Sequence, residues 1–383
     1  MNMNTTPQSE RLNIVVLGAC NSGKSSLINM LAGQEVSLTS DVAGTTTDPV
    51  RRAMEIPNAG PALLTDTAGF DDTTPLGIQR VELTLKTLEA ADMALLLTGE
   101  NTEAEKKWIS MLKNRGIPFV KVANKSDIHG DREADVCVSA CRKEDRQKLI
   151  DAILQKIPSD FAPRDLLGNL VDTGDLVVLV MPQDSQAPKG RLILPQVQTI
   201  RALIDRGCTV VCATPQNLCH SLAKLSATPD LVITDSQVFD FVESNIPDGI
   251  RLTSFSILMA AYKGDIEYFV NSARKLHSLN SSSRVLIAEA CTHVPANEDI
   301  GRVKIPAMLK KKAGEGITID FATGKDFPSD LTGYDLIIHC GGCMFNRRMI
   351  MSRVQRAREA GVAMTNYGVT IACLKGIIDK VVY

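Results

Sequence analysis

The stretch GACNSGKS, residues 18–25, combines glycines, a lysine and hydroxyl groups directly after an apolar run. Glycines in such a loop let backbone N–H groups wrap phosphates at the start of a helix. We expect Lys24 to reach the β- and γ-phosphates of a nucleotide and the Ser25 hydroxyl to bind Mg²⁺. The other residues predicted to bind the phosphates are Gly18, Asn21, Ser22, Gly23 and Ser26.

The stretch NKSD, residues 124–127, indicates which base the site selects. The Asp127 carboxylate can accept hydrogen bonds from guanine N1–H and the guanine amino group, whereas adenine has no matching pair of donors. The later stretch VSAC, residues 138–141, is similar to the last guanine-contacting loop of GTPases, in which a backbone N–H faces the base oxygen. The predicted base contacts are Asn124, Lys125, Asp127, Ser139 and Ala140.

A third stretch, DTAG at residues 66–69, follows the apolar run ALLT and completes a GTPase set. Asp66 is expected to hold Mg²⁺ through water, and Gly69 to donate its N–H to the γ-phosphate. Within GTTTDP, Thr46 is the candidate switch hydroxyl on Mg²⁺, with Thr45 as the alternative. The predicted catalytic set is therefore Lys24, Thr46, Asp66 and Gly69.

Cysteines near the other end of the chain suggest a metal site. Cys340 and Cys343 form a CxxC pair, whose spacing lets both thiolates face one centre, and Cys291 directly follows the apolar run RVLIAEA. If both preceding strands are parallel, their carboxyl ends open on one crevice and the three sulfurs converge. Gly341 and Gly342 would let the backbone wrap tightly around a cluster.

Three thiolates suit a 4Fe–4S cluster with one special iron, and a structural Zn²⁺ site of Cys₃His type is the competing interpretation. The remaining cysteines lack paired spacing or lie in apolar runs. Cys208 and Cys212 in particular are predicted to fill a core.

The elements that must position these residues alternate between strand and helix patterns throughout the chain. This rhythm predicts an α/β fold: a P-loop GTPase domain followed by two smaller α/β domains with mainly parallel sheets. The expected domains are residues 1–160, 165–262 and 263–383, with a proline-bearing linker at 158–165. One long helix is expected over residues 256–279.

Composition restricts the function. The 383 residues include 42 basic and 44 acidic side chains, a net charge of −2, which argues against nucleic-acid binding because that needs a basic stripe. No apolar run is long enough for a bilayer, and the polar start MNMNTTPQSE does not resemble a secretory signal. These features predict a cytoplasmic protein with neither a nucleic acid nor a membrane as partner.

The nucleotide motifs resemble those of potassium-stimulated GTPases of the TrmE and Era group, on the basis of Asn21 together with AGTTTD. The resemblance implies that Asn21 helps hold K⁺ beside the phosphates. Phe70 stands where Ras-like enzymes have a water-orienting glutamine. The expectation is therefore slow GTP hydrolysis that K⁺ accelerates.

The whole chain resembles the FeFe-hydrogenase maturation GTPases of the HydF family, most specifically at CTH (291–293) and HCGGC (339–343). The resemblance implies that Cys291, Cys340 and Cys343 bind the 4Fe–4S cluster. It points to Glu298 as a labile fourth ligand, with His293 and His339 as alternatives.

The resemblance also implies a scaffold, a homodimer or a tetramer, that accepts a diiron subcluster precursor made with the radical SAM maturases HydE and HydG. The loaded scaffold would pass this cargo to the FeFe-hydrogenase apoprotein. The main rival is a TrmE- or Era-like GTPase in RNA modification or ribosome assembly with a structural metal module. A second rival is a redox enzyme that uses the cluster for electron transfer.

Overall fold

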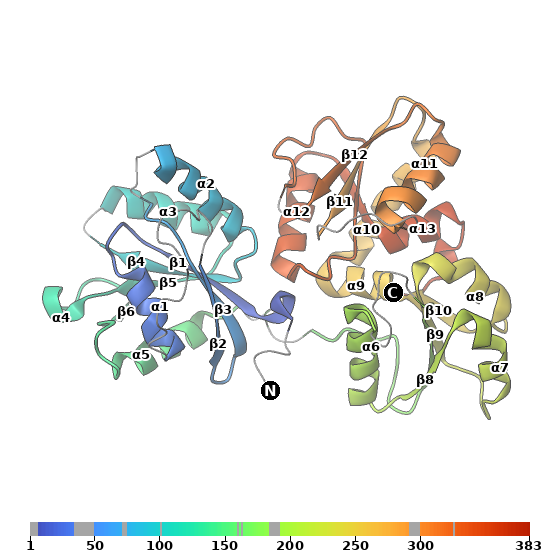
Figure 1. Cartoon of the computed structure of the whole chain (residues 1–383), viewed down its shortest axis with the longest axis horizontal. Helices are drawn as coiled ribbons and strands as arrows, with labels where there is room; N and C mark the ends of the chain where they lie inside the picture. Colours follow the sequence, from blue (N-terminus) through green and yellow to red (C-terminus); the bar gives the residue numbers. More distant parts are fainter. Residues whose placement is uncertain are drawn as a thin grey trace. The chain divides into compact units, whose positions relative to one another are not determined.

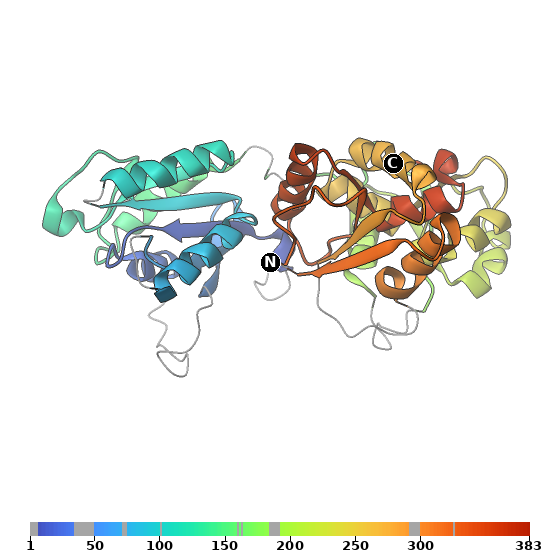
Figure 2. The ribbon, with the colours of Figure 1, turned by 90° about the horizontal axis from the view of Figure 1, so that it is seen from above.

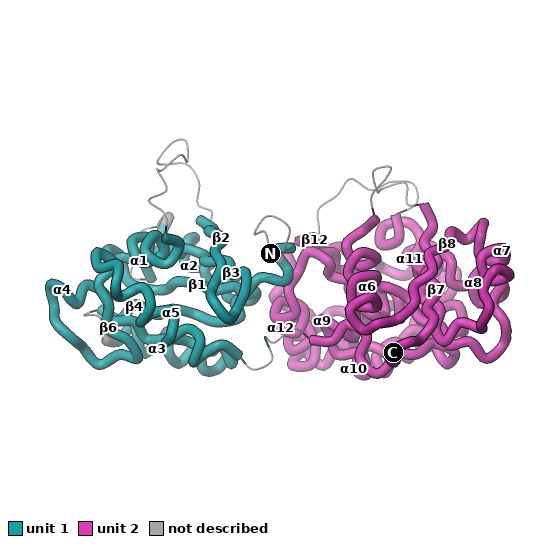
Figure 3. Tube along the Cα trace, turned by 90° about the horizontal axis from the view of Figure 1, so that it is seen from below, with its two compact units in different colours: residues 1–163 teal, residues 164–383 magenta. Residues whose placement is uncertain are grey.

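The computed structural model describes residues 7–33, 50–70, 75–99, 102–158, 161, 164–183, 192–290, 299–324 and 326–383 (Figure 1). The chain divides into two compact units, Met1–Pro163 and Arg164–Tyr383 (Figure 3). The predicted α/β class is confirmed in both units, because mostly parallel strands alternate with helices. The further division of the second unit at residues 262 and 263 stays a prediction.

The first unit is built on a six-stranded sheet in the order β2-β3-β1-β4-β5-β6. Its described strand pairs are parallel except β2 with β3. The strands are β1 (Leu12–Leu17), β2 (Arg51–Ile56), β3 (Gly60–Asp66), β4 (Met93–Thr98), β5 (Phe119–Ala123) and β6 (Val136–Cys137). The helices are α1 (Lys24–Ala32), α2 (Pro75–Leu88), α3 (Thr102–Asn114), α4 (Ser126–His129) and α5 (Asp145–Lys156).

Helices lie on both sides of this sheet (Figure 2). Leu27 of α1 and Leu149 of α5 pack in one core with β1, and Leu88 of α2 and Leu112 of α3 pack in another. Because both faces are covered, the central strands β1 and β4 are almost continuously apolar.

The second unit contains two four-stranded sheets whose described pairs are all parallel. The first has the order β10-β9-β7-β8 and the second the order β12-β11-β13-β14. The strands are β7 (Leu176–Val180), β8 (Thr209–Ala213), β9 (Leu231–Thr234), β10 (Arg251–Ser254), β11 (Arg284–Glu289), β12 (Thr318–Thr323), β13 (Leu336–His339) and β14 (Ala363–Asn366). The α-helices are α6 (Leu194–Asp205), α7 (Leu218–Ala223), α8 (Phe239–Asn245), α9 (Phe255–Lys263), α10 (Ile266–Ala273), α11 (Ile305–Ala313), α12 (Arg347–Glu359) and α13 (Tyr367–Leu374).

The two sheets of the second unit share one hydrophobic core. Val178 and Val232 of the first sheet belong to the same buried cluster as Val285 and Ile337 of the second. The end of the chain strengthens the connection, because the Val382 N–H donates to the Leu252 carbonyl of β10 at 3.0 Å. The two sheets therefore depend on each other for burial.

The single helix expected over 256–279 is wrong. The chain forms α9, breaks at Gly264, and then forms α10 and a 3₁₀ turn. Asp265 caps α10 by accepting the Tyr268 N–H at 3.0 Å, and a side chain at Gly264 would lie 2.4 Å from the Phe269 ring. None of the described helices is long and apolar enough to cross a membrane.

The expectation that Cys208 and Cys212 fill a core is wrong for Cys212, which is exposed. Cys208 is half-buried and packs against the edge of a core cluster. Both lie in or next to β8, the edge strand of its sheet. An apolar run in an edge strand need not be covered on either face, so its pattern does not establish burial.

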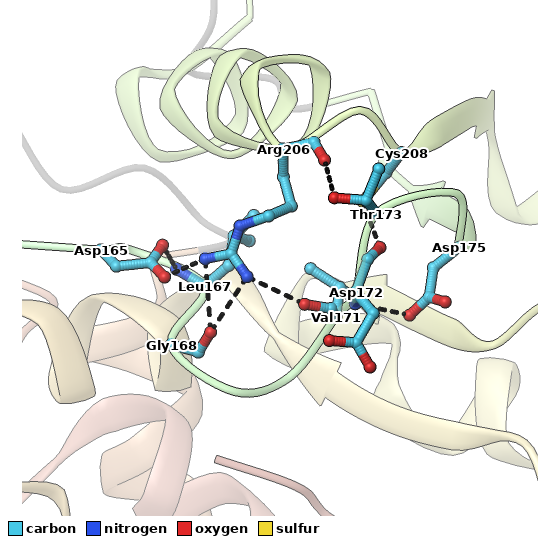
Figure 4. A network of polar contacts seen from close by, with 9 residues as sticks. All are labelled: Asp165, Leu167, Gly168, Val171, Asp172, Thr173, Asp175, Arg206 and Cys208. Atoms are coloured by element: carbon cyan, nitrogen blue, oxygen red, sulfur yellow. Dashed lines mark hydrogen bonds and ion pairs between the residues drawn. The ribbon is translucent and has the colours of Figure 1, made fainter.

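Arg206, which follows α6, anchors the first residues of the second unit to the end of that helix (Figure 4). Its guanidinium donates to the Val171 carbonyl at 2.9 Å and pairs with the Asp165 carboxylate. The Thr173 hydroxyl donates back to the Arg206 carbonyl at 3.0 Å. One side chain thus satisfies backbone groups of a segment that has no regular secondary structure.

Replacing Arg206 should therefore loosen residues 164–175. We expect Arg206→Met to speed amide hydrogen exchange there by about tenfold, because two or more charge-assisted hydrogen bonds are lost. Exchange mass spectrometry on the full chain measures this. Arg201→Met is the control, since Arg201 is exposed and pairs with Asp205 one turn away on the same helix. Equal exchange in the two variants would contradict the anchoring role.

Candidate functional site

The phosphate-binding loop joins β1 to α1 in the first unit. The Lys24 ammonium lies within the loop and donates to the carbonyls of Gly18 at 3.0 Å and Ala19 at 2.8 Å. The Ser25 hydroxyl donates to the Asp66 carboxylate at 2.5 Å. The hydroxyl and the carboxylate, which were predicted from two separate motifs, therefore lie together, and Lys24 lies in the same loop as the hydroxyl.

Two polar atoms in this loop region are buried and have no hydrogen-bond partner among the described residues: Ser22 Oγ and Asp66 Oδ1. A buried polar atom without a partner is costly, so such atoms mark where a ligand or its water would bind. Their position fits a nucleotide and the water shell of Mg²⁺. Ser26, the last predicted phosphate contact, lies in the first turn of α1.

The loop requires glycine at two of its positions. A side chain at Gly18 would lie 2.6 Å from Ser22 Oγ, and one at Gly23 would lie 2.3 Å from Asn124 Nδ2. Gly23 and Asn21 both have left-handed backbones, with φ of 90° and 60°. Asn21 is exposed at the loop tip.

Asn124 connects the base motif to the phosphate loop. Its Nδ2 donates to the Ser22 carbonyl at 3.0 Å, and its Oδ1 accepts the Ala140 N–H at 3.2 Å. Lys125 adds a second link, because its ammonium donates to the Asn21 carbonyl at 2.7 Å. The Ala140 N–H expected to face the base oxygen is thus bonded to Asn124 here.

Asp127 lies in α4, just after β5, and is solvent-accessible. A hydrogen bond from the Ser139 side chain holds the pKa of its carboxyl below the usual value. The carboxylate is therefore ionised at neutral pH and accepts hydrogen bonds, as guanine recognition requires. Asp145, which the motif reading missed, anchors the same loop by accepting the Ser139 N–H at 2.9 Å.

The stretch at residues 66–69 begins at the end of β3 and is tied to β1. The Thr67 hydroxyl donates to the Val16 carbonyl at 2.7 Å, and the buried Gly69 follows. Phe70 is partly buried and packs against the core, with its ring centroid 5.7 Å from that of Trp108. Thr46 and Thr45 lie outside the described residues.

The cysteine pair lies in the second unit, in the loop between β13 and α12. Cys340 Sγ accepts backbone N–H groups from Ala290 at 3.1 Å and Gly342 at 3.4 Å. N–H donors directed at a sulfur stabilise a thiolate, which is the form that binds iron. Gly342 has φ of 63°, and a side chain there would lie 2.7 Å from Ile350, so the CxxC turn requires glycine at this position.

The β11 and β13 strands bring the two cysteine motifs together. They are parallel neighbours, with Ala288 paired with His339. Ala290, whose N–H contacts Cys340 Sγ, immediately precedes Cys291 in the chain. Cys291, His293 and Glu298 lie outside the described residues, and the described ones contain no group of three or more potential metal ligands.

His339 has both ring nitrogens engaged. Nδ1 lies 2.7 Å from the Cys340 carbonyl oxygen, and Nε2 lies 2.9 Å from the Arg353 guanidinium. Burial and the Arg353 charge lower the pKa of His339 to about 3, so the ring is neutral and donates from Nδ1. As placed, this side chain braces the Cys340 backbone and has no free nitrogen for a metal.

Three residues beside the cysteines were missed by motif reading. Glu289 is buried at the end of β11 and pairs with Arg302 at 2.8 Å. Burial, together with Cys340 and Glu289, raises the pKa of Tyr367, so this phenol stays protonated. No spacing pattern marks these residues. The only available signal was the acidic Glu289 ending an apolar run.

The base-contacting geometry makes a specific prediction. Replacing Asp127 by Asn should weaken GTP binding by about a hundredfold, because two hydrogen bonds to a charged acceptor are lost. Xanthosine triphosphate should bind the variant better than GTP, since its base offers an acceptor to the new amide. Titration calorimetry with both nucleotides measures this, and Asp131→Asn, at an exposed position nearby, is the control. Unchanged GTP affinity in Asp127→Asn would contradict the assignment.

Comparison with curated proteins finds relatives of the first unit. The tRNA modification GTPase MnmE of Chromobacterium violaceum is 40% identical over 128 residues, which are 32% of this chain and 28% of that protein. MnmE of Nitrosomonas europaea is 39% identical over 123 residues, or 31% of this chain and 27% of that protein. The chain therefore spans less than a third of the length of these relatives.

Among solved structures, Aquifex aeolicus Era bound to GDP and AlF₄⁻ is 21% identical, with a TM-score of 0.33, over 56% of this chain and 98% of that one. The G domain of FeoB from Methanococcus jannaschii is 18% identical, with a TM-score of 0.29, over 38% of this chain and 98% of that one.

Three family profiles match the chain in succession. Residues 13–125 match the 50S ribosome-binding GTPase profile. Residues 166–264 match the hydrogen maturase F dimerisation domain, and residues 267–383 match its tetramerisation domain, which supports homo-oligomerisation. The two hydrogen maturase F profiles together match more than half of the chain. The chain therefore belongs to the hydrogen maturase F family, HydF, and carries a GTPase domain of the TrmE and Era type.

Proposed function

We propose that this chain is a GTP-hydrolysing scaffold that holds a 4Fe–4S cluster, assembles the diiron subcluster of FeFe-hydrogenase and delivers it to the apo-hydrogenase. The observation that carries the proposal is the Cys340 thiol, which accepts N–H groups from its own CxxC turn and from Ala290, the neighbour of Cys291. Membership of the hydrogen maturase F family supports the same function.

Cys291, Cys340 and Cys343 would hold the cluster, and the donor set fits it. Sulfur ligands favour iron–sulfur clusters or zinc, and N–H groups directed at a ligand sulfur help set a cluster's potential. When bound, the cluster would supply one iron that is not coordinated by a cysteine. Glu298 and His293 are the proposed ligands for that iron, and His339 would first have to give up a contact of its ring.

The diiron precursor is cargo in this proposal, made with the radical SAM maturases HydE and HydG. The working form would be a homodimer or a tetramer in the cytoplasm, with the apo-hydrogenase as recipient. GTP binding or hydrolysis would favour one arrangement of the switch residues and so bias partner exchange. The net charge of −2 fits protein partners better than nucleic acid.

A second candidate is favoured by one observation: the curated relatives of the first unit are tRNA modification GTPases. In that case the cysteines would hold a structural metal such as Zn²⁺. Purification from cells distinguishes the candidates, since stoichiometric tRNA or ribosomal RNA and a colourless zinc-loaded protein would favour the second.

The scaffold proposal is tested by loading the full chain anaerobically with iron and sulfide and then adding the diiron cargo and apo-hydrogenase. Wild type should bind about four iron and four sulfide per chain and activate the hydrogenase. Cys340→Ala should lose most of the iron and the activation. Cys219→Ala, at an exposed cysteine, is the matched control and should behave as wild type.

Two results would count against this proposal. Iron uptake that is unaffected by replacing Cys291, Cys340 and Cys343 together would remove the cluster site. Undiminished activation by Cys340→Ala would show that the cluster is dispensable for delivery.

Potassium dependence is a separate prediction. GTP turnover should rise at least about tenfold in KCl over NaCl, because K⁺ held beside the phosphates stabilises developing charge. Asn21→Gly keeps the left-handed backbone but removes the amide oxygen, so the salt difference should vanish. Asn29→Ala, on the exposed face of α1, is the control. Equal turnover of wild type in the two salts would refute the proposed role of Asn21.

A further inference from the structure

A buried lysine lies against the cysteine loop. Lys263 is the last residue of α9, and only 2% of its surface is exposed. Its ammonium donates to the carbonyls of Gly342 at 3.1 Å, Cys343 at 3.3 Å and Phe345 at 2.9 Å. An ammonium has three N–H donors, and three carbonyls of one short loop face it.

The burial of this charge ties it to the shape of the loop. A buried ammonium is costly unless its donors are satisfied. The three carbonyls can satisfy it together only while residues 342–345 curl around it, with Gly342 in its left-handed conformation. The turn that follows Cys340 and contains Cys343 is therefore held in shape by Lys263, a residue of α9.

A second cation makes the reciprocal contact. Arg347, the first residue of α12, donates to the Gly264 carbonyl at 2.7 Å and to the Tyr262 carbonyl at 3.5 Å. The end of α9 thus reaches into the cysteine loop through Lys263, and the residue after the loop reaches back to the end of α9. Cation–carbonyl contacts therefore join α9 and the cysteine loop from both sides, with one cation supplied by α9 and the other by the first residue of α12.

The charge has a consequence for any cluster held by Cys340 and Cys343. Reduction adds negative charge, and a positive charge fixed in a low-dielectric interior stabilises the reduced form more than the oxidised one. Lys263 lies within the profile match to the dimerisation domain, whereas the cysteines lie within the match to the tetramerisation domain. The charge and the cysteines thus come from different matched segments.

We propose that Lys263 is a positioning residue for the iron–sulfur site: it shapes the Cys340–Cys343 turn and raises the reduction potential of the cluster. This inference rests on the proposed cluster at Cys291, Cys340 and Cys343. The cysteine spacing in the sequence gives no indication that α9, which carries Lys263, contributes to the metal site.

The test compares Lys263→Met with wild type in the anaerobically reconstituted full chain, by a redox titration followed by electron paramagnetic resonance. At a fixed potential near the midpoint, the reduced-to-oxidised ratio should fall about tenfold, which equals about 59 mV for a one-electron couple. Lys275→Met removes the same charge from an exposed position and should cause no comparable shift, since solvent screens it.

A second readout uses iron-free protein. Releasing the loop should make alkylation of Cys343 about tenfold faster in Lys263→Met than in Lys275→Met, as followed by peptide mass spectrometry. If Lys263→Met does not fold, Lys263→Arg decides. A cluster-loaded arginine variant with the wild-type reduction potential supports the proposal. An arginine variant whose reduced-to-oxidised ratio at the same fixed potential falls by the full tenfold overturns it.

The outcomes separate the inference from the proposed function. A wild type that takes up no cluster ends both. A wild-type cluster whose potential and thiol reactivity are the same in Lys263→Met and Lys275→Met overturns the role of Lys263 and leaves the cluster proposal intact.

Discussion

Parallel strands end at one edge of a sheet, and both candidate sites depend on this constraint. In the first unit, the phosphate loop follows β1, Asp66 ends β3 and Asn124 follows β5. In the second unit, Ala290 follows β11 and Cys340 follows the neighbouring β13. Segments that are distant in the chain therefore lie at the same edge of a sheet, because the pairing of the parallel strands aligns their carboxyl ends.

Loops at such edges leave carbonyl groups without strand partners, and this chain satisfies several of them with lysine. Lys24 bonds the carbonyls of Gly18 and Ala19, and Lys125 bonds that of Asn21. Lys263 does the same for the cysteine loop. These loops thus have cations against their backbones, which stabilise the loops and favour negative charge nearby.

Several side chains near Cys340 are both buried and polar. His339 is neutral and braces the Cys340 carbonyl, while Glu289 is paired with Arg302. Arg353 lies between the rings of Phe327 and Phe345, which keeps its charge away from water. His339, Glu289 and Arg353 are buried, and electrostatic contacts among buried groups are stronger than they would be at the surface.

The sequence by itself determined the fold class and the order of the motifs, and it supplied the candidate nucleotide and cysteine residues, because these follow from local spacing and strand-to-loop position. It did not determine that α9 ends at Lys263, since no helix-breaking proline marks the site and the close approach of the Phe269 ring to Gly264 becomes visible only once α10 has formed. Nor did it show that Cys212 is exposed, because strand order in a sheet decides which apolar run lies at an edge. Only the folded chain brought Lys263 and Arg353 to the cysteine loop, since a buried cation is defined by the groups that surround it and these come from distant segments.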